Sequence, residues 1–147
     1  MKLYFVRHGE TEWNTQRRFQ GRKNSPLTAK GKEQAKKIAE ELKEIPFTSL
    51  YSSSLERAKK TAQEIQKGRE IPVEIMDEFI EISMGDLEGR TKGDFLELYP
   101  EEYEKYIQAD LDYNPGAFSG ERFEDIQLRL KQGMKRLVEK HREEDIV

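Results

Sequence analysis

Leu3-Tyr4-Phe5-Val6-Arg7-His8-Gly9 is the stretch that decides the fold. Its first four residues are apolar and include aromatic and β-branched side chains, which favour strands. A short apolar run without polar alternation is typical of a strand that is buried on both faces, as in parallel sheets. We therefore expect a buried strand over Leu3–Val6 with a polar turn at its carboxyl end, the edge where open α/β sheets bind their ligands.

The segments after this run predict an alternation of helices and strands. In the first half we expect a strand over Leu3–Val6, a helix from Thr28 to about Glu44, a strand over Phe47–Tyr51, a helix capped by Ser53 or Ser54 and closed at Gly68, and a strand over Val73–Met76. In the second half we expect a loop over Asp77–Arg90, two helical pieces over Lys92–Gln108 that separate at Pro100, and a loop over Asn114–Gly120. A helix over Glu121–Arg142 and the start of a further strand at Ile146–Val147 complete the expected order. The order predicts an α/β fold, a three-layer α/β/α sandwich with a mostly parallel sheet and helices on both faces.

Length and composition narrow the class of protein. The chain has 147 residues, the size of one ordinary domain, so we expect a single domain over 1–147. It has no cysteine, which excludes disulfides, zinc–thiolate sites and thiol catalysis. No apolar run suits a membrane span or a signal peptide, and no basic block mixed with aromatics suggests a nucleic-acid surface. We expect a soluble cytoplasmic protein that binds neither membrane nor nucleic acid.

The charge is distributed unevenly. Residues 1–60 hold 14 Lys/Arg and 7 Asp/Glu, and residues 61–147 hold 12 and 22, which together make the 26 basic and 29 acidic residues of the chain. A basic first half suits an anionic ligand. The alternative is that many of these lysines only solvate one helix.

His8 is the first candidate for chemistry. It is one of only two histidines, and a neutral imidazole is a good nucleophile near neutral pH. The adjacent Arg7 disfavours protonation of that imidazole, and Gly9 lets the backbone approach a ligand closely. A lone histidine at a strand end is more often structural, so its context has to decide.

Further anion-binding groups follow in the sequence. Asn14 is either a turn residue or a donor to an anion, and Gln20-Gly21 can offer an amide and a bare backbone N–H. Arg57 falls in the first turn of the second predicted helix, where a cation opposes the helix dipole. It makes sense there if its planar fork binds an anion beside the helix start. The alternative is a surface arginine paired with Glu56.

A carboxylate at the third strand end could act as a proton donor and acceptor. Four acids, Glu78, Glu81, Asp86 and Glu88, lie in the loop after Val73–Met76. Their spacing does not choose among them.

Four motifs follow one another along the chain. They are Arg7-His8-Gly9-Glu10-Thr11 with Trp13-Asn14, Gln20-Gly21 through Ser25-Pro26-Leu27-Thr28 and Gly31, Ser52-Ser53 with Leu55, Arg57-Ala58 and Thr61, and Glu81 with Gly85 and Leu87-Glu88-Gly89. Each motif is weak alone, but all four in this order are specific. In this combination essentially the whole chain resembles the histidine phosphatase superfamily, also called the phosphoglycerate mutase-like family.

The resemblance implies a role for each matching residue. His8 would be the nucleophile that becomes phosphorylated, Arg7, Arg57 and Asn14 would bind the phosphoryl oxygens, Gln20 and Gly21 would line the same pocket, and Glu81 would be the general acid and then the base for water. It implies a small phosphorylated substrate and no metal, because arginines supply the positive charge around the phosphoryl group.

The family contains both phosphatases and cofactor-dependent mutases. Lys92 has a mutase-like offset from Glu81, but from there to Gly120 the only further basic residue is Lys105, and acids dominate. That stretch would repel a second phosphate. Gly120-Glu121-Arg122-Phe123 resembles the broad-specificity phosphatases.

We therefore expect a phosphomonoester hydrolase without a cofactor. The alternative is a phosphoglycerate mutase, which would require 2,3-bisphosphoglycerate. Five aromatic residues, Phe95, Tyr99, Tyr103, Tyr106 and Tyr113, either line an apolar leaving-group pocket or only pack the helices together.

One departure from the family concerns a second catalytic histidine. The resemblance implies that it follows the next strand, whereas this sequence ends at Asp145-Ile146-Val147. His141 precedes that strand, and we expect it to be a packing residue. We expect the C-terminal part of the fold to be missing, with an open apolar groove, exposed strand edges, poor activity and a tendency to aggregate. A truncated phospho-ligand binder without catalysis and a homodimer both stay open.

Overall fold

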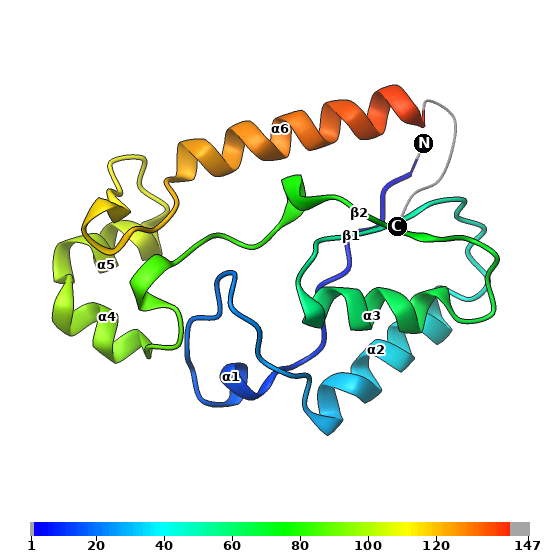
Figure 1. Cartoon of the computed structure of the whole chain (residues 1–147), viewed down its shortest axis with the longest axis horizontal. Coiled ribbons are helices and arrows are strands. Elements are labelled where there is room, and N and C mark those ends of the chain that lie inside the picture. Colours follow the sequence, from blue (N-terminus) through cyan, green and yellow to red (C-terminus); the bar gives the residue numbers. More distant parts are fainter. Residues whose placement is uncertain (1, 142–147) are drawn as a thin grey trace.

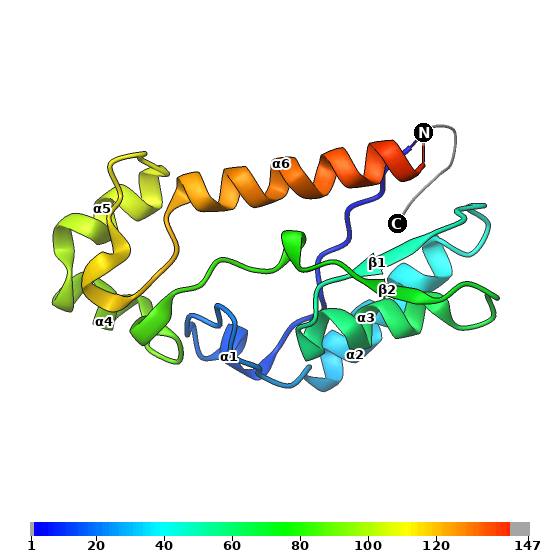
Figure 2. The ribbon, with the colours of Figure 1, turned by 45° about the horizontal axis from the view of Figure 1, so that its top comes forward.

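The computed structural model describes residues 2–141, and these form a three-layer α/β arrangement. The elements are α1 (Glu12–Thr15), α2 (Ala29–Glu41), β1 (Leu50–Ser52), α3 (Glu56–Gln66), β2 (Val73–Ile75), the 3₁₀ turns η1 (Asp77–Phe79) and η2 (Gly85–Leu87), α4 (Lys92–Leu98), α5 (Pro100–Gln108), the 3₁₀ turn η3 (Pro115–Phe118) and α6 (Phe123–Lys140). Helices α2 and α3 lie on one side of the strands and α6 lies on the other (Figures 1 and 2). The α/β class and the helices on both faces are as predicted.

The sheet of the described residues has two parallel strands joined by α3. Leu50 lies opposite Val73, and Ser52 lies opposite Ile75. Parallel neighbours require a crossover connection, and the amphipathic α3 supplies it while packing on both strands. The strands begin and end within a few residues of their predicted ranges.

The prediction that Leu3–Val6 is buried on both faces is wrong. This run does not join the β1–β2 sheet, and the Phe5 side chain is 76% exposed. A strand is buried on both faces only where layers cover it on both sides. Here the side toward α6 borders an open groove, described below, so the apolar run crosses the molecule without full cover.

The two long helices of the first half begin in different ways. Thr28 caps α2 as predicted, because its hydroxyl accepts the Gly31 N–H at 2.9 Å. The prediction of Ser53 or Ser54 as the cap of α3 is wrong, since Leu55 occupies that position and makes no side-chain cap. Instead Asn24, from a distant loop, accepts the Glu56 N–H with Oδ1 at 3.0 Å. This hydrogen bond ties the loop that carries Asn24 to the first turn of α3.

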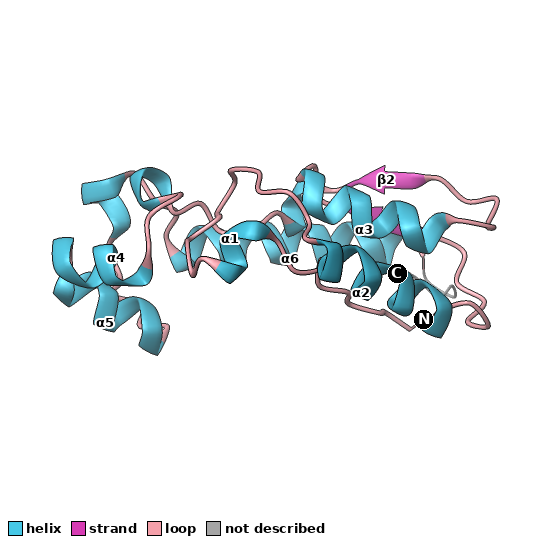
Figure 3. Ribbon diagram, turned by 90° about the horizontal axis from the view of Figure 1, so that it is seen from below, coloured by secondary structure: helices cyan, strands magenta, loops and turns pink. Residues whose placement is uncertain are grey.

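Helices α4 and α5 form the end of the molecule away from the sheet (Figure 3). They separate at Pro100 as predicted, and this proline occupies the first helical position of α5, where its missing N–H costs nothing. An aromatic core lies beneath them. Its buried members are Phe19, Met84, Leu87, Phe95, Tyr113 and Phe118, and Tyr99, Tyr103, Tyr106 and Phe123 pack against it. The five aromatic residues singled out above therefore pack the helices together, and Tyr106 in addition lines the pocket described below.

Helix α6 runs from beside the α4–α5 end of the molecule to the region where the N-terminus lies and ends at Lys140 (Figure 1). His141 follows it, is 4% exposed and bonds through Nε2 to the Tyr51 hydroxyl at 2.8 Å, so it packs the helix end onto β1 as expected. Arg142 and the strand expected at Ile146–Val147 lie outside the described residues. Within residues 2–141, no helix is both long and apolar enough to cross a membrane.

Candidate active site

The imidazole of His8 is held in one defined protonation form. Its Nδ1 lies 2.7 Å from the Gly9 carbonyl oxygen, and its Nε2 lies 3.1 Å from Nε of Arg57. A carbonyl oxygen can only accept and a guanidinium N–H can only donate. The proton of the neutral ring therefore sits on Nδ1, and Nε2 carries the lone pair that a nucleophile needs.

The electrostatics favour the same neutral form. Burial lowers the pKa of His8 below its usual 6.5, and the positive charges of Arg57 and Arg7 lower it further. The Gly9 carbonyl and the Glu81 carboxylate act in the opposite direction but do not reverse the shift. His8 is therefore unprotonated at neutral pH.

Arg57 is the buried cation beside this nucleophile. It lies in the first turn of α3 and is only 1% exposed. Its Nη1 donates to the Lys23 carbonyl oxygen at 2.9 Å, and its Nη2 donates to the Gly21 carbonyl oxygen at 2.8 Å. Burial lowers the pKa of Arg57, yet a guanidinium remains charged in proteins. The fork is thus fixed to the loop on one side and directs Nε to His8 on the other.

Of the predicted binding residues of the first loops, Arg7 and Gly21 adjoin this pair, whereas no hydrogen bond joins Asn14 or Gln20 to it among the described residues. Arg7 is exposed next to His8. Asn14 accepts the backbone N–H and the hydroxyl of Thr11 through Oδ1, each at 3.0 Å, so its NH₂ group remains to donate. Gln20 is 9% exposed, and its Oε1 has no hydrogen-bond partner among the described residues. Gly21 has a φ of +49°, which favours glycine.

His8, Arg57 and Glu81 line one pocket of about 420 Å³. Glu81 is exposed, and its Oε1 accepts the Ile82 N–H at 3.0 Å. The three side chains come from three different segments that follow predicted strand ends, and their convergence agrees with the sequence argument. The remaining lining is mostly apolar and includes Leu55, Ile80, Tyr106, Phe123, Ile126 and Leu130.

Arg129 lines the same pocket and was missed by the sequence analysis. It is on α6, and both oxygens of Glu121 accept from it, from Nε at 2.7 Å and from Nη2 at 3.0 Å. Its Nη1 donates to the Glu78 carbonyl oxygen at 2.8 Å. The signal was its place three residues after Ile126, on the buried stripe of α6.

Glu88 was left among four equivalent acids, and the structure distinguishes it from the others. Its carboxylate accepts the backbone N–H groups of Arg22, Lys23 and Met84. No sequence signal links Glu88 to Arg22 and Lys23, because these two contacts join segments more than sixty residues apart. Among the described residues, no group of three or more His, Asp and Glu side chains could hold a metal ion.

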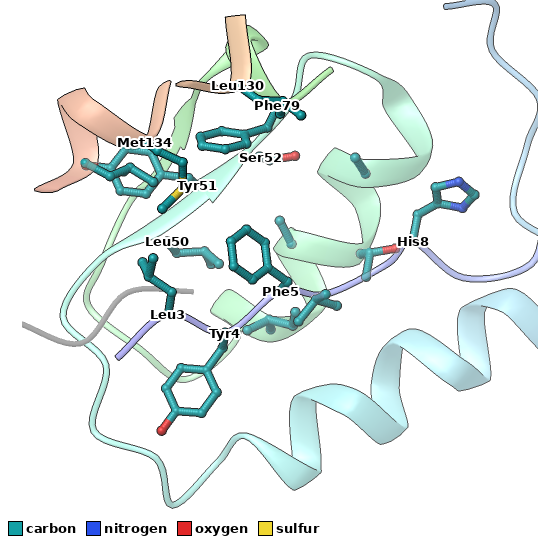
Figure 4. A pocket seen from close by; sticks show the side chains of 16 residues that line it. Leu3, Tyr4, Phe5, His8, Leu50, Tyr51, Ser52, Phe79, Leu130 and Met134 are labelled. Atoms are coloured by element: carbon teal, nitrogen blue, oxygen red, sulfur yellow. The ribbon is translucent and has the colours of Figure 1, made fainter. Parts of the chain in front are cut away.

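A larger apolar groove of about 520 Å³ lies against the N-terminal run. Its walls come from the Leu3–Val6 segment, β1, α3 and α6 (Figure 4). Phe5 lies among the lining residues and His8 stands at one end (Figure 4). The groove and the smaller pocket thus share His8.

Comparisons with known proteins agree with this geometry. A model of the histidine phosphatase superfamily (branch 1) matches residues 3–147. A protein of Escherichia fergusonii named "Probable phosphoglycerate mutase GpmB" is 43% identical over 91 residues, which cover 62% of this chain and 42% of that protein. A protein of the same name from Photorhabdus laumondii is 34% identical over 91% of this chain and 61% of its own length. The chain therefore spans less than two thirds of these curated relatives.

Solved structures give the same fold. Bacillus stearothermophilus YhfR is 37% identical with a TM-score of 0.91, over 99% of this chain and 70% of that one. The alpha-ribazole phosphatase of Shigella flexneri is 33% identical with a TM-score of 0.87, over 99% and 71%. A mycobacterial glucosyl-3-phosphoglycerate phosphatase in complex with VO3 is 26% identical with a TM-score of 0.83, over 95% and 70%.

Proposed function

Because the chain belongs to the histidine phosphatase superfamily (branch 1), we propose that it transfers a phosphoryl group from a phosphomonoester to His8 and then to water. The observation that carries this proposal is the orientation of the imidazole. Nε2 is unprotonated, faces the pocket that also contains Glu81, and lies against the buried guanidinium of Arg57.

The first step forms a bond between Nε2 and phosphorus and breaks the bond between phosphorus and the leaving oxygen. Arg57 supplies positive charge beside the transferred group, and its Nε–H, which donates to the Nε2 lone pair in the free chain, passes to a phosphoryl oxygen as that lone pair bonds to phosphorus. Glu81 gives a proton to the leaving oxygen, so that an alcohol departs. The Nδ1–H bond to the Gly9 carbonyl supports the positive charge that develops on the ring.

The second step returns the enzyme to its starting state. Glu81, now a carboxylate, takes a proton from water, the resulting hydroxide oxygen bonds to phosphorus, and the bond from Nε2 breaks. Inorganic phosphate leaves with the neutral imidazole restored. Each proton taken up by Glu81 in this step replaces the one that it gave in the first.

Hydrolysis is favoured over a mutase reaction by the charges around the pocket. A mutase must hold a bisphosphate, and its second phosphate needs a cation with free donors. Among the described residues that line the pocket, the cations are Arg57 and Arg129. Arg129 is already engaged by Glu121 and by the Glu78 carbonyl, so it offers little to a second phosphate.

The apolar part of the pocket supports an uncharged leaving group. Ile80, Ile82, Phe123 and Ile126 would desolvate a charged leaving group without pairing it, which is unfavourable. Three of the solved neighbours are named as phosphatases, whereas one from Bacillus anthracis is named as a phosphoglycerate mutase and the curated relatives as probable phosphoglycerate mutases. We therefore propose a phosphomonoester with an apolar leaving group as the substrate, and a phosphoglycerate mutase as the alternative.

The covalent intermediate provides the test. After exposure to 1-naphthyl phosphate and rapid quenching, we expect an acid-labile phosphate on His8 by mass spectrometry. His8→Asn should lose it, and His141→Asn, which changes the other histidine, should keep it. A phosphate that survives in His8→Asn contradicts the proposal. Thermal stabilisation by inorganic phosphate without any labelling identifies a phospho-ligand binder instead.

A second measurement separates hydrolase from mutase. The chain is given 3-phosphoglycerate together with 2,3-bisphosphoglycerate, and both phosphate release and isomerisation are followed. We expect phosphate release from 1-naphthyl phosphate to exceed that from 3-phosphoglycerate, with no rapid isomerisation. Fast isomerisation with little phosphate release would establish the mutase.

A further inference from the structure

The Glu88 carboxylate holds the loop that carries Gly21, Arg22 and Lys23. Oε1 accepts the Arg22 N–H at 2.9 Å and the Met84 N–H at 3.1 Å, and Oε2 accepts the Lys23 N–H at 3.1 Å. The Lys23 ammonium returns a bond to the Glu88 carbonyl oxygen at 3.1 Å. Three bonds to the carboxylate come from the main chain, so this grip fixes the backbone path of the loop.

The opposite side of the same loop holds Arg57. The carbonyls of Gly21 and Lys23 accept Nη2 and Nη1 of Arg57, and Nε of Arg57 donates to Nε2 of His8. The Gly21 carbonyl and the Arg22 N–H belong to one planar trans peptide, so they point in opposite directions. This single peptide therefore lies between the Glu88 carboxylate and the Arg57 guanidinium.

Gly21 and Glu88 are matched in shape. A Cβ at position 21 would overlap the Glu88 carboxylate, and the positive φ of Gly21 adds a second reason for glycine. The negative charge of Glu88 also reaches Arg57, whose protonated form it favours. The acid, the peptide and the arginine thus form one continuous arrangement that ends at the nucleophile.

We propose that Glu88 is a positioning residue that acts through the Gly21–Arg22 peptide and Arg57 to hold the guanidinium against Nε2 of His8. The inference rests on the proposed phosphoryl transfer at His8. Glu88 itself is not a proton donor or acceptor in the reaction, because its oxygens already receive three backbone N–H groups. Among the acids of its loop, Glu81 is the one that lines the pocket with His8.

The titration of His8 tests this arrangement without any turnover. In Glu88→Ala the loop loses its acceptor, Arg57 moves from the ring, and the pKa of His8 should rise, as measured by NMR of the imidazole protons. Simple removal of a nearby negative charge would shift the pKa of His8 downward. The direction of the shift therefore distinguishes positioning from a direct charge effect, and His141 is an internal control that should not change.

The same variants are then compared in the phosphorylation of His8 by 1-naphthyl phosphate. Glu88→Ala should lower the maximal labelling rate by about 100-fold with a smaller effect on the half-saturating concentration, because misplacing a catalytic group by about 1 Å costs that much. Glu88→Asp keeps a carboxylate and should restore part of the rate. Glu33→Gln, which removes an exposed acid of α2, is the matched control and should leave both measurements unchanged.

The outcomes are distinguishable from those of the proposed function. An unchanged or lowered pKa of His8 in a folded Glu88 variant overturns the positioning role, as does an unchanged labelling rate. If Glu88→Ala does not fold, Glu88→Gln takes its place, because it keeps the side-chain shape and loses one acceptor oxygen. A wild-type chain that never becomes labelled overturns the hydrolase proposal, whereas the His8 titration still reports on the positioning role.

Discussion

Arg57 is a buried cation that donates hydrogen bonds to two carbonyl oxygens and one imidazole nitrogen. Burying a charge is costly unless its hydrogen bonds are satisfied, and each N–H used here has a fixed direction. The arrangement leaves the positive charge itself unneutralised by any direct ion pair among the described residues. Such a site attracts an anion, which supports the proposed phosphoryl group beside His8.

Arg57→Lys should impair both stability and labelling. An ammonium cannot reproduce the planar fork, so at least one carbonyl loses its partner, at a cost of about 1–3 kcal/mol in the free energy of unfolding. The rate of His8 phosphorylation should fall by roughly 100-fold. Urea unfolding and quenched labelling measure the two effects.

Arg69→Lys is the control for that experiment. Arg69 also donates to three backbone carbonyls, of Leu42, Lys43 and Ile45, but it lies away from the pocket. It should lose a similar amount of stability and keep the wild-type labelling rate. Equal losses of labelling in both variants would show that Arg57 acts only through the fold.

The lowered pKa of His8 gives a pH prediction. Because the folded chain binds this proton more weakly than the unfolded chain, the neutral nucleophile persists as the pH falls below 6.5. The initial labelling rate should keep its neutral-pH value into that range, and the His8 contribution to stability should diminish there as the unfolded chain takes up the proton. An acid limb of the labelling rate centred at or above pH 6.5 would contradict the shift.

The convergence of His8, Arg57 and the loop of Glu81 on one pocket could be predicted because each segment follows the end of a strand or strand-like run, and such ends meet at one edge. The choice of Glu81 among the four acids of its loop did not follow from their spacing and came only from the resemblance to the family. The roles of Glu88 and Arg129 could not be predicted. Each depends on a backbone group or a carboxylate from a distant segment, and one sequence carries no pattern that pairs them.

At the scale of elements, the features that depend on residues near one another in the sequence could be predicted. Thr28 caps α2, Pro100 begins α5, and the parallel pairing of β1 and β2 follows from the alternation of elements. The cap of α3 was mispredicted because Asn24 supplies it from outside the helix. The burial of Leu3–Val6 was mispredicted because it depends on what covers the groove, which is a tertiary property.

Helix α6 owes its close approach to η1 to Gly133. A Cβ there would contact the Cβ of Glu78 at 2.8 Å and the ring of Phe79 at 3.1 Å. Gly133→Ala should therefore destabilise the fold by about 1–3 kcal/mol through overpacking, although alanine favours a helix by nearly 1 kcal/mol. The midpoint of urea unfolding measures the net effect.

Gly93 in α4 provides the matched control. A Cβ there meets only the Thr91 hydroxyl oxygen, at an ordinary 3.6 Å. Gly93→Ala should then raise the free energy of unfolding by up to about 1 kcal/mol, since only helix propensity changes. A stabilised Gly133→Ala variant would contradict the close packing of α6 on η1.

At the scale of the molecule, two of the hydrophobic cores lie at different ends of the fold. An aliphatic core that includes Leu50 and Ile65 packs α2 and α3 beneath β1, and the aromatic core supports α4 and α5. The site lies between these ends, with the apolar groove behind it. The groove wall combines buried side chains such as Leu50 with exposed ones such as Phe5.

Truncation of two groove-lining residues should distinguish the buried part of the groove wall from its exposed part. Leu50→Ala removes a side chain that is 2% exposed and should cost about 2–5 kcal/mol. Phe5→Ala removes a larger side chain that is 76% exposed, and it should cost less than about 1 kcal/mol. Chemical unfolding of both variants compares them, and a larger loss in Phe5→Ala would contradict the exposure of the N-terminal run.

The groove and the catalytic pocket share Val6, His8, Ala58, Phe79 and Leu130 in their walls. One side of His8 thus borders an apolar groove whose lining does not favour a phosphate. We therefore expect a compound screen on this chain to identify apolar, uncharged molecules that bind the groove as readily as phosphate mimics that bind the pocket. The groove-binding molecules would act from behind the imidazole, and added substrate would not simply compete them away.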